Sequence, residues 1–324
     1  MRAFVTGGSG FVGKRLITEL KGRGHTMRAL GRSEAARKEV SDAGAEPWEG
    51  DLSDVEVLKR GMEGCEVVFH SAALVKTWGP RGDFYAANVR GTENVLEAAR
   101  AVGVKRLVHV STEAVLLDGT PMVNVDETRP LPEKPIGLYS ETKGAAERLV
   151  LSVNSPELTT VAVRPRFVWG LGDNAVLPSI IAAVKAGKFR WVDGGHYKTS
   201  TCHVANCVEG MLLAAEKGQG GQAYFLTDGA PVDFRDFVTA LLKTQGVDPG
   251  SKTISRGFAT GVATVSELLW NFLWLSGAPP ITRSELLLVG DEVTVSDAKA
   301  RRELGYEGFV TREAGLRELT KAKA

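Results

Sequence analysis

Residues 6–13 read Thr-Gly-Gly-Ser-Gly-Phe-Val-Gly, directly after the apolar run Ala3–Val5 and at the start of a helical pattern over Phe11–Gly22. A strand that turns through glycines into a helix lets the backbone approach a pyrophosphate closely, and the helix N-terminus then stabilises the negative charge. Glycine-rich loops are common, so the support comes from the strand–turn–helix context and not from the spacing alone. We therefore expect a dinucleotide site here, with a plain structural turn as the alternative.

Strand and helix signals alternate through the first half of the chain. Apolar, β-branched runs predict strands at Ala3–Val5, Thr26–Leu30, Val67–His70, Leu107–Val110 and Thr159–Val163. Helical patterns lie between them, at Phe11–Gly22, Asp54–Met62, Gly91–Val102 and Ile136–Val153. Repeated units of this kind predict an α/β fold with a Rossmann-type, doubly wound parallel sheet. The run Thr159–Val163 contains no charged residue, which is typical of a central strand.

The pattern changes after Arg164-Pro165, where glycines cluster and the expected helices Val204–Lys217 and Phe234–Thr244 alternate with short strand signals. We predict two intertwined units. The first is a dinucleotide-binding Rossmann domain over residues 1–169, and the second is a smaller C-terminal α/β lobe over residues 170–324 that binds the substrate.

The bulk composition favours a soluble cytoplasmic protein. A formal net charge of +1 gives no general attraction to nucleic acid or to anionic membranes. Three cysteines without metal or redox spacing are expected to be reduced thiols, and the five histidines lack ligand spacing, so we expect no metal. No signal-peptide pattern precedes the first strand. The apolar segment 258–275 is too short to span a membrane, which leaves peripheral membrane contact as an option.

The choice of cofactor depends on the end of the second strand. Gly31 stands where NAD enzymes usually carry an acidic side chain, and Arg32 follows it. A guanidinium pairs well with the 2′-phosphate of NADP. We therefore favour NADP(H), with NAD(H) possible if Arg32 is only a solvated loop charge. Asp51 is expected near the adenine, or as the N-cap of the helix that follows it.

Tyr139 and Lys143 lie four residues apart in an expected helix, so both side chains lie on one helix face. A phenol with an ordinary pKa near 10 needs that pKa lowered by roughly three units to act as an acid/base near neutrality, and a nearby ammonium acts in this direction. An isolated Tyr-x-x-x-Lys is more often a surface pair. Here it follows the glycine loop and a strand that ends Val110-Ser111-Thr112, where a hydroxyl can donate to a substrate carbonyl or merely cap the next turn.

Together these motifs resemble the extended short-chain dehydrogenases/reductases over essentially the whole chain. The resemblance implies catalytic roles for Thr112, Tyr139 and Lys143, with Lys143 also holding the nicotinamide ribose. The predicted cofactor site comprises Gly7, Ser9, Gly10, Phe11, Val12, Gly13, Arg32, Asp51, Leu52, Ser71, Ala72, Ala73, Asn88, Ser111, Tyr139, Lys143, Pro165, Phe167 and Val168. The candidate substrate-contacting residues are Trp78, Phe84, Glu113, Arg166 and Trp169.

At three places the sequence differs from other members of this family, and these differences narrow the reaction and substrate that we expect. Sugar dehydratases carry Thr-Asp-Glu where this chain reads Thr112-Glu113-Ala114. Nucleotide-sugar enzymes typically carry an Arg-Asp pair just before the helix that here begins near His203, where this chain reads Lys198-Thr199-Ser200-Thr201-Cys202-His203. The Leu- and Trp-rich run 265–275 resembles the 3β-hydroxysteroid dehydrogenase branch. An apolar helix over the site is expected from this run, with a buried core helix or a dimer contact as the alternatives.

The prediction is an NAD(P)(H)-dependent oxidoreductase that interconverts a secondary alcohol and a ketone on a hydrophobic, steroid-, lipid- or flavonoid-like substrate by hydride transfer. In reduction, Tyr139 would donate a proton to the carbonyl oxygen held by Thr112, and Lys143 would lower the phenol's pKa. The alternatives are a nucleotide-sugar epimerase or reductase with tightly bound NAD, and a non-catalytic dinucleotide-sensing regulator. A homodimer through the helix that carries Tyr139 is an expectation from the family resemblance.

Overall fold

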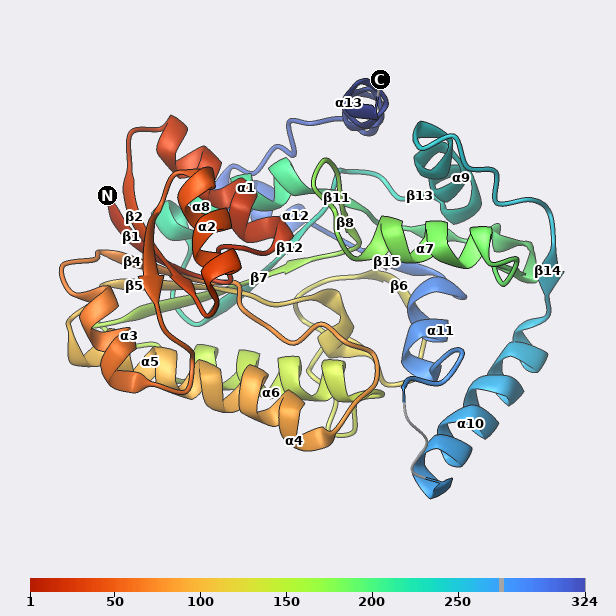
Figure 1. The fold of residues 1–324 in the computed structure, drawn as a ribbon, viewed down its shortest axis with the longest axis horizontal. Helices are drawn as coiled ribbons and strands as arrows, with labels where there is room; N and C mark the ends of the chain where they lie inside the picture. The colour runs from red at the N-terminus through yellow and green to blue at the C-terminus, as the bar shows by residue number, and fades with distance from the viewer. Residues whose placement is uncertain (274–276, 324) are drawn as a thin grey trace.

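Seven parallel strands form the larger sheet, in the order β12-β7-β5-β4-β1-β2-β3 (Figure 1). The strands are β1 (Arg2–Thr6), β2 (Thr26–Gly31), β3 (Glu46–Glu49), β4 (Val67–His70), β5 (Arg106–Val110), β7 (Thr159–Pro165) and β12 (Gln222–Leu226). The computed structural model describes residues 1–273 and 277–323. The winding of the chain reverses between β1 and β4, the point at which doubly wound sheets bind ligands. The predicted α/β Rossmann-type fold is confirmed, and β7 is a central strand as expected.

Helices cover both faces of this sheet (Figure 1). On one face lie α1 (Phe11–Gly22), α2 (Glu34–Ala43) and α8 (Val204–Lys217), and on the other lie α3 (Val55–Met62), α5 (Gly91–Ala101) and α6 (Leu138–Ser152). Each face has its own apolar core, the first built with Leu16 and Met211 and the second with Leu58 and Val95. The bounds of α1 and α8 agree with the prediction, whereas α2 and β3 were not predicted.

A second, mixed sheet has the order β13-β10-β15-β6. Its strands are β6 (Met122–Val125), β10 (Lys198–Thr199), β13 (Val232–Asp233) and β15 (Val293–Val295). Strand β6 comes before residue 170 and β12 comes after it, so each sheet includes a strand from the other half of the chain. Besides α8, the described helices after residue 170 are α7 (Val176–Lys185), α9 (Phe234–Thr244), α10 (Arg256–Leu273), α11 (Arg283–Val289), α12 (Ala298–Leu304) and α13 (Arg312–Lys323).

Short elements complete the described structure. They are α4 (Arg81–Phe84), the π-helix η1 (Tyr85–Arg90), the 3₁₀ helices η2 (Glu113–Leu116) and η3 (Asp193–Gly195), and the strands β8 (Val168–Trp169), β9 (Trp191–Val192), β11 (Cys202–His203) and β14 (Thr253–Ile254). Strands β8 and β11 pair with each other, as do β9 and β14.

Helix α10 lies at the margin of the molecule (Figure 1). It buries the small residues Ala259 and Ala263 against the body and exposes large apolar side chains on another face. These exposed residues are Phe258, Val265, Leu268, Leu269, Phe272 and Leu273. Trp274 and Leu275 of the predicted apolar segment lie outside the described residues. Within residues 1–273 and 277–323, no helix is both long enough and apolar enough to cross a membrane.

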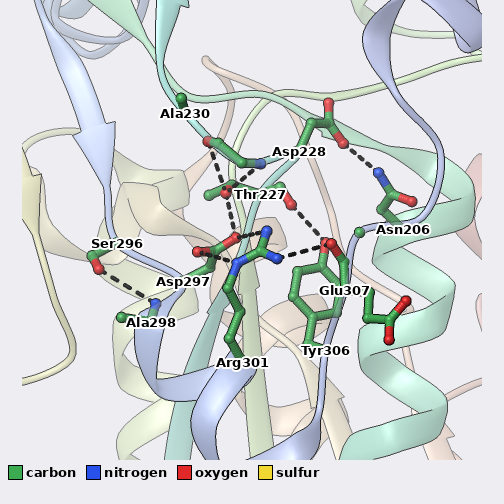
Figure 2. Close-up of polar contacts among 12 residues, drawn as sticks. Asn206, Thr227, Asp228, Ala230, Ser296, Asp297, Ala298, Arg301, Tyr306 and Glu307 are labelled. Atoms are coloured by element: carbon green, nitrogen blue, oxygen red, sulfur yellow. Dashed lines mark hydrogen bonds and ion pairs between the residues drawn. The ribbon is translucent and has the colours of Figure 1, made fainter.

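Two carboxylates, Asp228 and Asp297, lie near the end of β12 and accept hydrogen bonds from the elements around it (Figure 2). Asp297 accepts a hydrogen bond from Thr227 Oγ1 (2.7 Å) and pairs with Arg301 (2.8 Å). Asp228 accepts four hydrogen bonds, from Trp169 Nε1 (2.7 Å), Thr201 Oγ1 (2.7 Å), Asn206 Nδ2 (2.7 Å) and the backbone N–H of His203 (2.6 Å). One side chain therefore satisfies donors from β8, β11 and α8.

Replacing Asp228 by Ala is expected to lower the free energy of unfolding by about 3–5 kcal/mol, because several buried donors lose their acceptor together. The measurement is chemical denaturation followed by circular dichroism. Asp126→Ala is the matched control, since the exposed side chain of Asp126 accepts hydrogen bonds from Thr128 in its own loop, and it should cost less than about 1 kcal/mol. Equal losses in the two variants would contradict the role assigned to Asp228.

Candidate active site

The glycine loop between β1 and α1 leaves no room for side chains. A Cβ on Gly13 would lie 2.1 Å from the carbonyl oxygen of Gly7, and a Cβ on Gly7 would lie 2.7 Å from the backbone N of Ala72. Gly7 also has a φ of 71°, which other residues rarely adopt. Helix α1 begins at Phe11 with no side-chain cap on its N-terminus and no acidic residue in its first turn. Its N-terminal N–H groups therefore suit an anion, so this loop fits a dinucleotide pyrophosphate.

Hydrogen bonds join the ends of β1 and β4, where the winding reverses. Ser71 Oγ donates to Thr6 O (2.7 Å), and the backbone N–H of Ala72 donates to Thr6 Oγ1 (3.3 Å). His70 contacts Thr6 through Nδ1 (2.7 Å) and Thr92 through Nε2 (2.9 Å). Burial, and then the charge of Lys143, lower the pKa of His70 to about 3, so this imidazole is neutral at physiological pH.

The side chain of Asn88 holds the segment after β4, which is predicted to line the cofactor site, in place. Its Oδ1 accepts from the backbone N–H of Leu74 (2.7 Å), and its Nδ2 donates to Thr142 Oγ1 (3.0 Å) on α6. The side chain thus links the segment after β4, which contains Ser71, Ala72 and Ala73, to the helix that carries Tyr139. Direct contact of these residues with the cofactor stays a prediction.

The predicted adenine end of the site lies at the ends of β2 and β3. The Arg32 side chain is 84% exposed, and its Nη1 lies 4.0 Å from Asp51 Oδ2. Asp51 accepts from the backbone N–H of Ser53 (3.0 Å), whereas the N-cap of α3 is Asp54. The alternative in which Asp51 caps that helix is therefore wrong. Leu52 lies against α5, because a Cβ on Gly91 would come within 2.9 Å of its Cδ1.

The three predicted catalytic residues come together between β5 and α6. Thr112 follows β5, and Tyr139 and Lys143 lie in the first two turns of α6. Tyr139 is half-buried and lies beside Thr112. Lys143 Nζ donates to Val110 O (2.7 Å) and lies 3.1 Å from His109 Nε2.

The pKa of Tyr139 shifts in the direction opposite to the one predicted. Burial raises the pKa of this phenol, the negative charge of Glu113 raises it further, and the hydrogen bond with Thr112 opposes the rise. The ammonium of Lys143 is directed instead at His109 and Val110 on β5. Burial lowers the pKa of Lys143 to about 7, an effect that Glu147 partly offsets. In this structure, Tyr139 is therefore a protonated phenol at neutral pH.

Two buried ion pairs lie beside the catalytic residues, one on α6 and one after the end of β5. Ser111 Oγ donates to Glu147 Oε2 (2.5 Å), and Glu147 accepts from Arg164 Nε (3.0 Å) on β7. Glu113 accepts from Thr112 Oγ1 (2.7 Å) and from Arg166 Nη1 (2.9 Å). Glu113 and Arg166 were predicted to contact substrate, but only 5% of each side chain is exposed.

The prediction that Phe84 and Trp169 contact the substrate is wrong. Phe84 and Trp169 have no exposed surface, because Phe84 packs under the segment that contains Gly79 and Trp169 lies between His203 and Phe237. Both aromatic rings fill the core, and only Trp78 of the three predicted aromatic residues is partly exposed.

The apolar cluster at Tyr139 was not predicted. Tyr139 packs against a group of buried apolar residues that includes Val115 and Val293, and Leu287 and Leu288 of α11 pack against the same group. Helix α11 therefore contributes apolar side chains to the cluster against which the catalytic tyrosine packs. The sequence signal was the capping box of Thr282 and Glu285, which the structure contains with both hydrogen bonds.

The last predicted cofactor residues follow β7. Pro165 ends that strand, and Phe167 adopts a positive φ of 46° with its ring 5.7 Å from the ring of Phe237. Val168 packs at the margin of the core shared by α1 and α8. Among the described residues, no group of three or more His, Cys, Asp or Glu side chains could hold a metal ion.

Known proteins resemble this chain over its whole length. A 4-hydroxy-2-methyl-3-oxo-4-farnesyl-3,4-dihydroquinoline-1-oxide ketoreductase from Stigmatella aurantiaca is 53% identical, with 99% of this chain and 96% of that protein covered. A 2-alkyl-3-oxoalkanoate reductase from Stenotrophomonas maltophilia is 36% identical, with both chains covered completely (100%). The crystal structure of gox2253 is 30% identical and superposes with a TM-score of 0.79, covering 99% of this chain and 97% of that one.

The sequence also matches the 3-beta hydroxysteroid dehydrogenase/isomerase family over residues 4–256. This range includes the glycine loop, Thr112, Tyr139 and Lys143. The chain therefore belongs to the 3-beta hydroxysteroid dehydrogenase/isomerase family of extended short-chain dehydrogenases/reductases and is an oxidoreductase that acts on CH–OH groups with a nicotinamide dinucleotide.

Proposed function

We propose that this protein is an NADPH-dependent ketoreductase that converts a ketone on a large apolar substrate to a secondary alcohol. The observation that carries the proposal is the position of Tyr139, which lies beside Thr112 at the end of β5 and one helical turn from Lys143. A tyrosine hydroxyl is protonated at neutral pH and can donate its proton to a carbonyl oxygen held next to it.

An apolar substrate is supported by the surroundings of Tyr139. Tyr139 packs against the same buried apolar cluster as Leu131, Leu287 and Leu288, so the region around the phenol is rich in hydrocarbon. The names of two relatives agree with this chemistry, since one acts on a farnesylated dihydroquinoline oxide and the other on 2-alkyl-3-oxoalkanoates. We infer a substrate whose ketone lies next to a long alkyl or prenyl chain.

The roles of the residues follow from their positions. The dinucleotide, when bound, supplies the hydride that is added to the carbonyl carbon. Gly7, Gly10 and Gly13 leave room for its pyrophosphate against the N-terminus of α1. Tyr139 donates the proton to the carbonyl oxygen, and Lys143 lies one turn further along α6, where its amine holds this end of the helix to β5 through Val110 O.

NADP(H) is preferred in this proposal because of Arg32. Its guanidinium is largely exposed, and the nearest carboxylate, Asp51, is 4.0 Å away, so the group is available to pair with a 2′-phosphate. A cytoplasmic location and a homodimer through α6 stay predictions. The exposed apolar face of α10 supports the finer prediction of peripheral contact with a membrane.

Tyr139→Phe is expected to lower kcat for ketone reduction by about 10²–10⁴-fold, because the proton donor is lost, while the Kd for NADPH changes by less than about threefold. Steady-state kinetics with prenylated and alkyl ketones, and fluorescence titration with NADPH, measure the two effects. Tyr85→Phe is the control, since its hydroxyl donates to Glu141 away from Thr112. Activity above a few per cent of wild type in Tyr139→Phe would refute the assignment.

Arg32→Ala is expected to raise KM for NADPH by about 10- to 100-fold and to leave KM for NADH nearly unchanged, because one charge-assisted hydrogen bond is lost. Lys38→Ala removes an equal charge from α2, where Lys38 pairs with Asp42 (2.7 Å), and should change neither constant by more than about twofold. Equal effects of Arg32→Ala on the two cofactors would contradict the NADP preference.

Lys143 makes the stability of the cofactor-free protein depend on pH. Its pKa is about 7 in the folded chain and near 10.5 when unfolded, so between these values the unfolded state binds more protons and the free energy of unfolding rises with pH. This one group contributes up to about 1.4 kcal/mol per pH unit. Denaturation curves from pH 7 to about 10 should show a smaller rise in Lys143→Met and an unchanged rise in the exposed control Lys105→Met.

A further inference from the structure

His109 is a buried imidazole on β5, an interior strand of the larger sheet, and its side chain is 1% exposed. Its Nε2 lies 3.1 Å from Lys143 Nζ, whereas its Nδ1 has no hydrogen-bond partner among the residues that the structure describes. An unpaired buried nitrogen costs free energy that a hydrocarbon side chain would avoid. The contact with Lys143 is therefore the polar contact that distinguishes this imidazole from an apolar ring of similar size.

The amine of Lys143 has two partners on β5. Its Nζ donates to Val110 O (2.7 Å) and lies 3.1 Å from His109 Nε2. An ammonium carries three N–H groups and no acceptor, so the imidazole accepts from it at Nε2 and carries its own proton on Nδ1. Two of the three N–H groups are held at the sheet in this way. The third is left for a ligand, and the ligand predicted for Lys143 is the nicotinamide ribose.

His109 stays neutral at physiological pH and can therefore keep this role. Burial lowers its pKa well below the usual range, and the charges of Lys143 and His70 act in the same direction. The ring of His70 on β4 lies 5.2 Å from that of His109. The carboxylate that raises the pKa of Lys143 is Glu147 on α6, which pairs with Arg164 on β7. Because the pKa of Lys143 is about 7, its amine changes charge near neutral pH while both histidines stay neutral.

We propose that His109 is a positioning residue for Lys143, which holds the ammonium form of the amine on β5 and leaves one N–H for the hydroxyl groups of the cofactor ribose. The proposal rests on the predicted contact of Lys143 with that ribose and is independent of the ketone that is reduced. A charge-assisted hydrogen bond stabilises the ammonium more than the neutral amine. His109 therefore increases the fraction of Lys143 that is charged, and with it the affinity for the cofactor at and above neutral pH.

The experiment is a fluorescence titration of the full-length protein with NADPH and with NADH between pH 6 and pH 9, without a ketone. In His109→Phe the amine loses one acceptor, which should lower the pKa of Lys143 by about one unit. The ratio of the Kd of the variant to that of wild type should then be about tenfold at pH 8 and about twofold at pH 6, where more of the amine is charged in both proteins. Both cofactors should show it, because they share the nicotinamide ribose.

Two further variants separate this role from packing. His109→Gln keeps an amide oxygen that can accept from Lys143, and its Kd at pH 8 should lie within about threefold of wild type. His196→Phe is the matched control, because it removes an exposed imidazole that lies 3.2 Å from Asp233, and it should change the Kd by less than about twofold at every pH.

A loss of affinity in His109→Phe that is equal at pH 6 and pH 8 would overturn the proposal, since a packing defect does not depend on the charge of Lys143. An unchanged Kd, or equal losses in His109→Phe and His109→Gln, would overturn it as well. If His109→Phe does not fold, His109→Leu takes its place. In a Lys143→Met background, replacing His109 should no longer change the pH dependence. Ketone reduction is tested separately by Tyr139→Phe, so its failure would leave this binding measurement intact.

Discussion

The buried carboxylate of Glu147 holds the catalytic helix on the sheet. Tyr139, Lys143 and Glu147 follow one another at intervals of four residues, so they form one stripe along α6. Each contacts a different group at the sheet: Tyr139 contacts Thr112, Lys143 contacts Val110 O, and Glu147 contacts Ser111. Glu147 also pairs with Arg164 on β7 and has no exposed surface. Because that ion pair fixes the rotation of α6, it also determines where the phenol of Tyr139 lies.

Much of this arrangement could be predicted because the signals are local. The glycine loop needs only a strand, a turn and a helix, and the bounds predicted for α1, α8 and α9 agree with the structure because an apolar stripe marks each helix. Helix α2 escaped prediction because Val40 is its one buried residue, and β3 because it is an edge strand containing Pro47 and two glutamates.

The contacts that decide the chemistry could not be found in this way, since they join distant residues. Glu113 pairs with Arg166, 53 positions further along the chain, and Arg166 contacts Leu288 a further 122 positions on. No pattern within one window of sequence contains both partners. The same limit explains why Phe84 and Trp169 were wrongly predicted to contact substrate. The sequence near an aromatic residue does not show whether its ring lines a pocket or fills the core. It also explains why the apolar cluster that Tyr139 shares with Leu287 and Leu288 of α11 was not predicted.

Two buried acid–arginine pairs flank the site, and they act in different ways. Glu147 and Arg164 contact Ser111 and α6, so their effect on Tyr139 is through the position of the helix. Glu113 contacts Thr112 itself and adds its charge to the environment of the phenol. Burying charges stabilises a fold less than apolar side chains of similar volume would, because desolvation offsets the attraction. What the second pair contributes in return is position: Glu113 contacts Thr112, and Arg166 ties that carboxylate to Leu288 O on α11 and to Thr199 on β10, so the end of β5 is held to the smaller lobe beside the catalytic tyrosine.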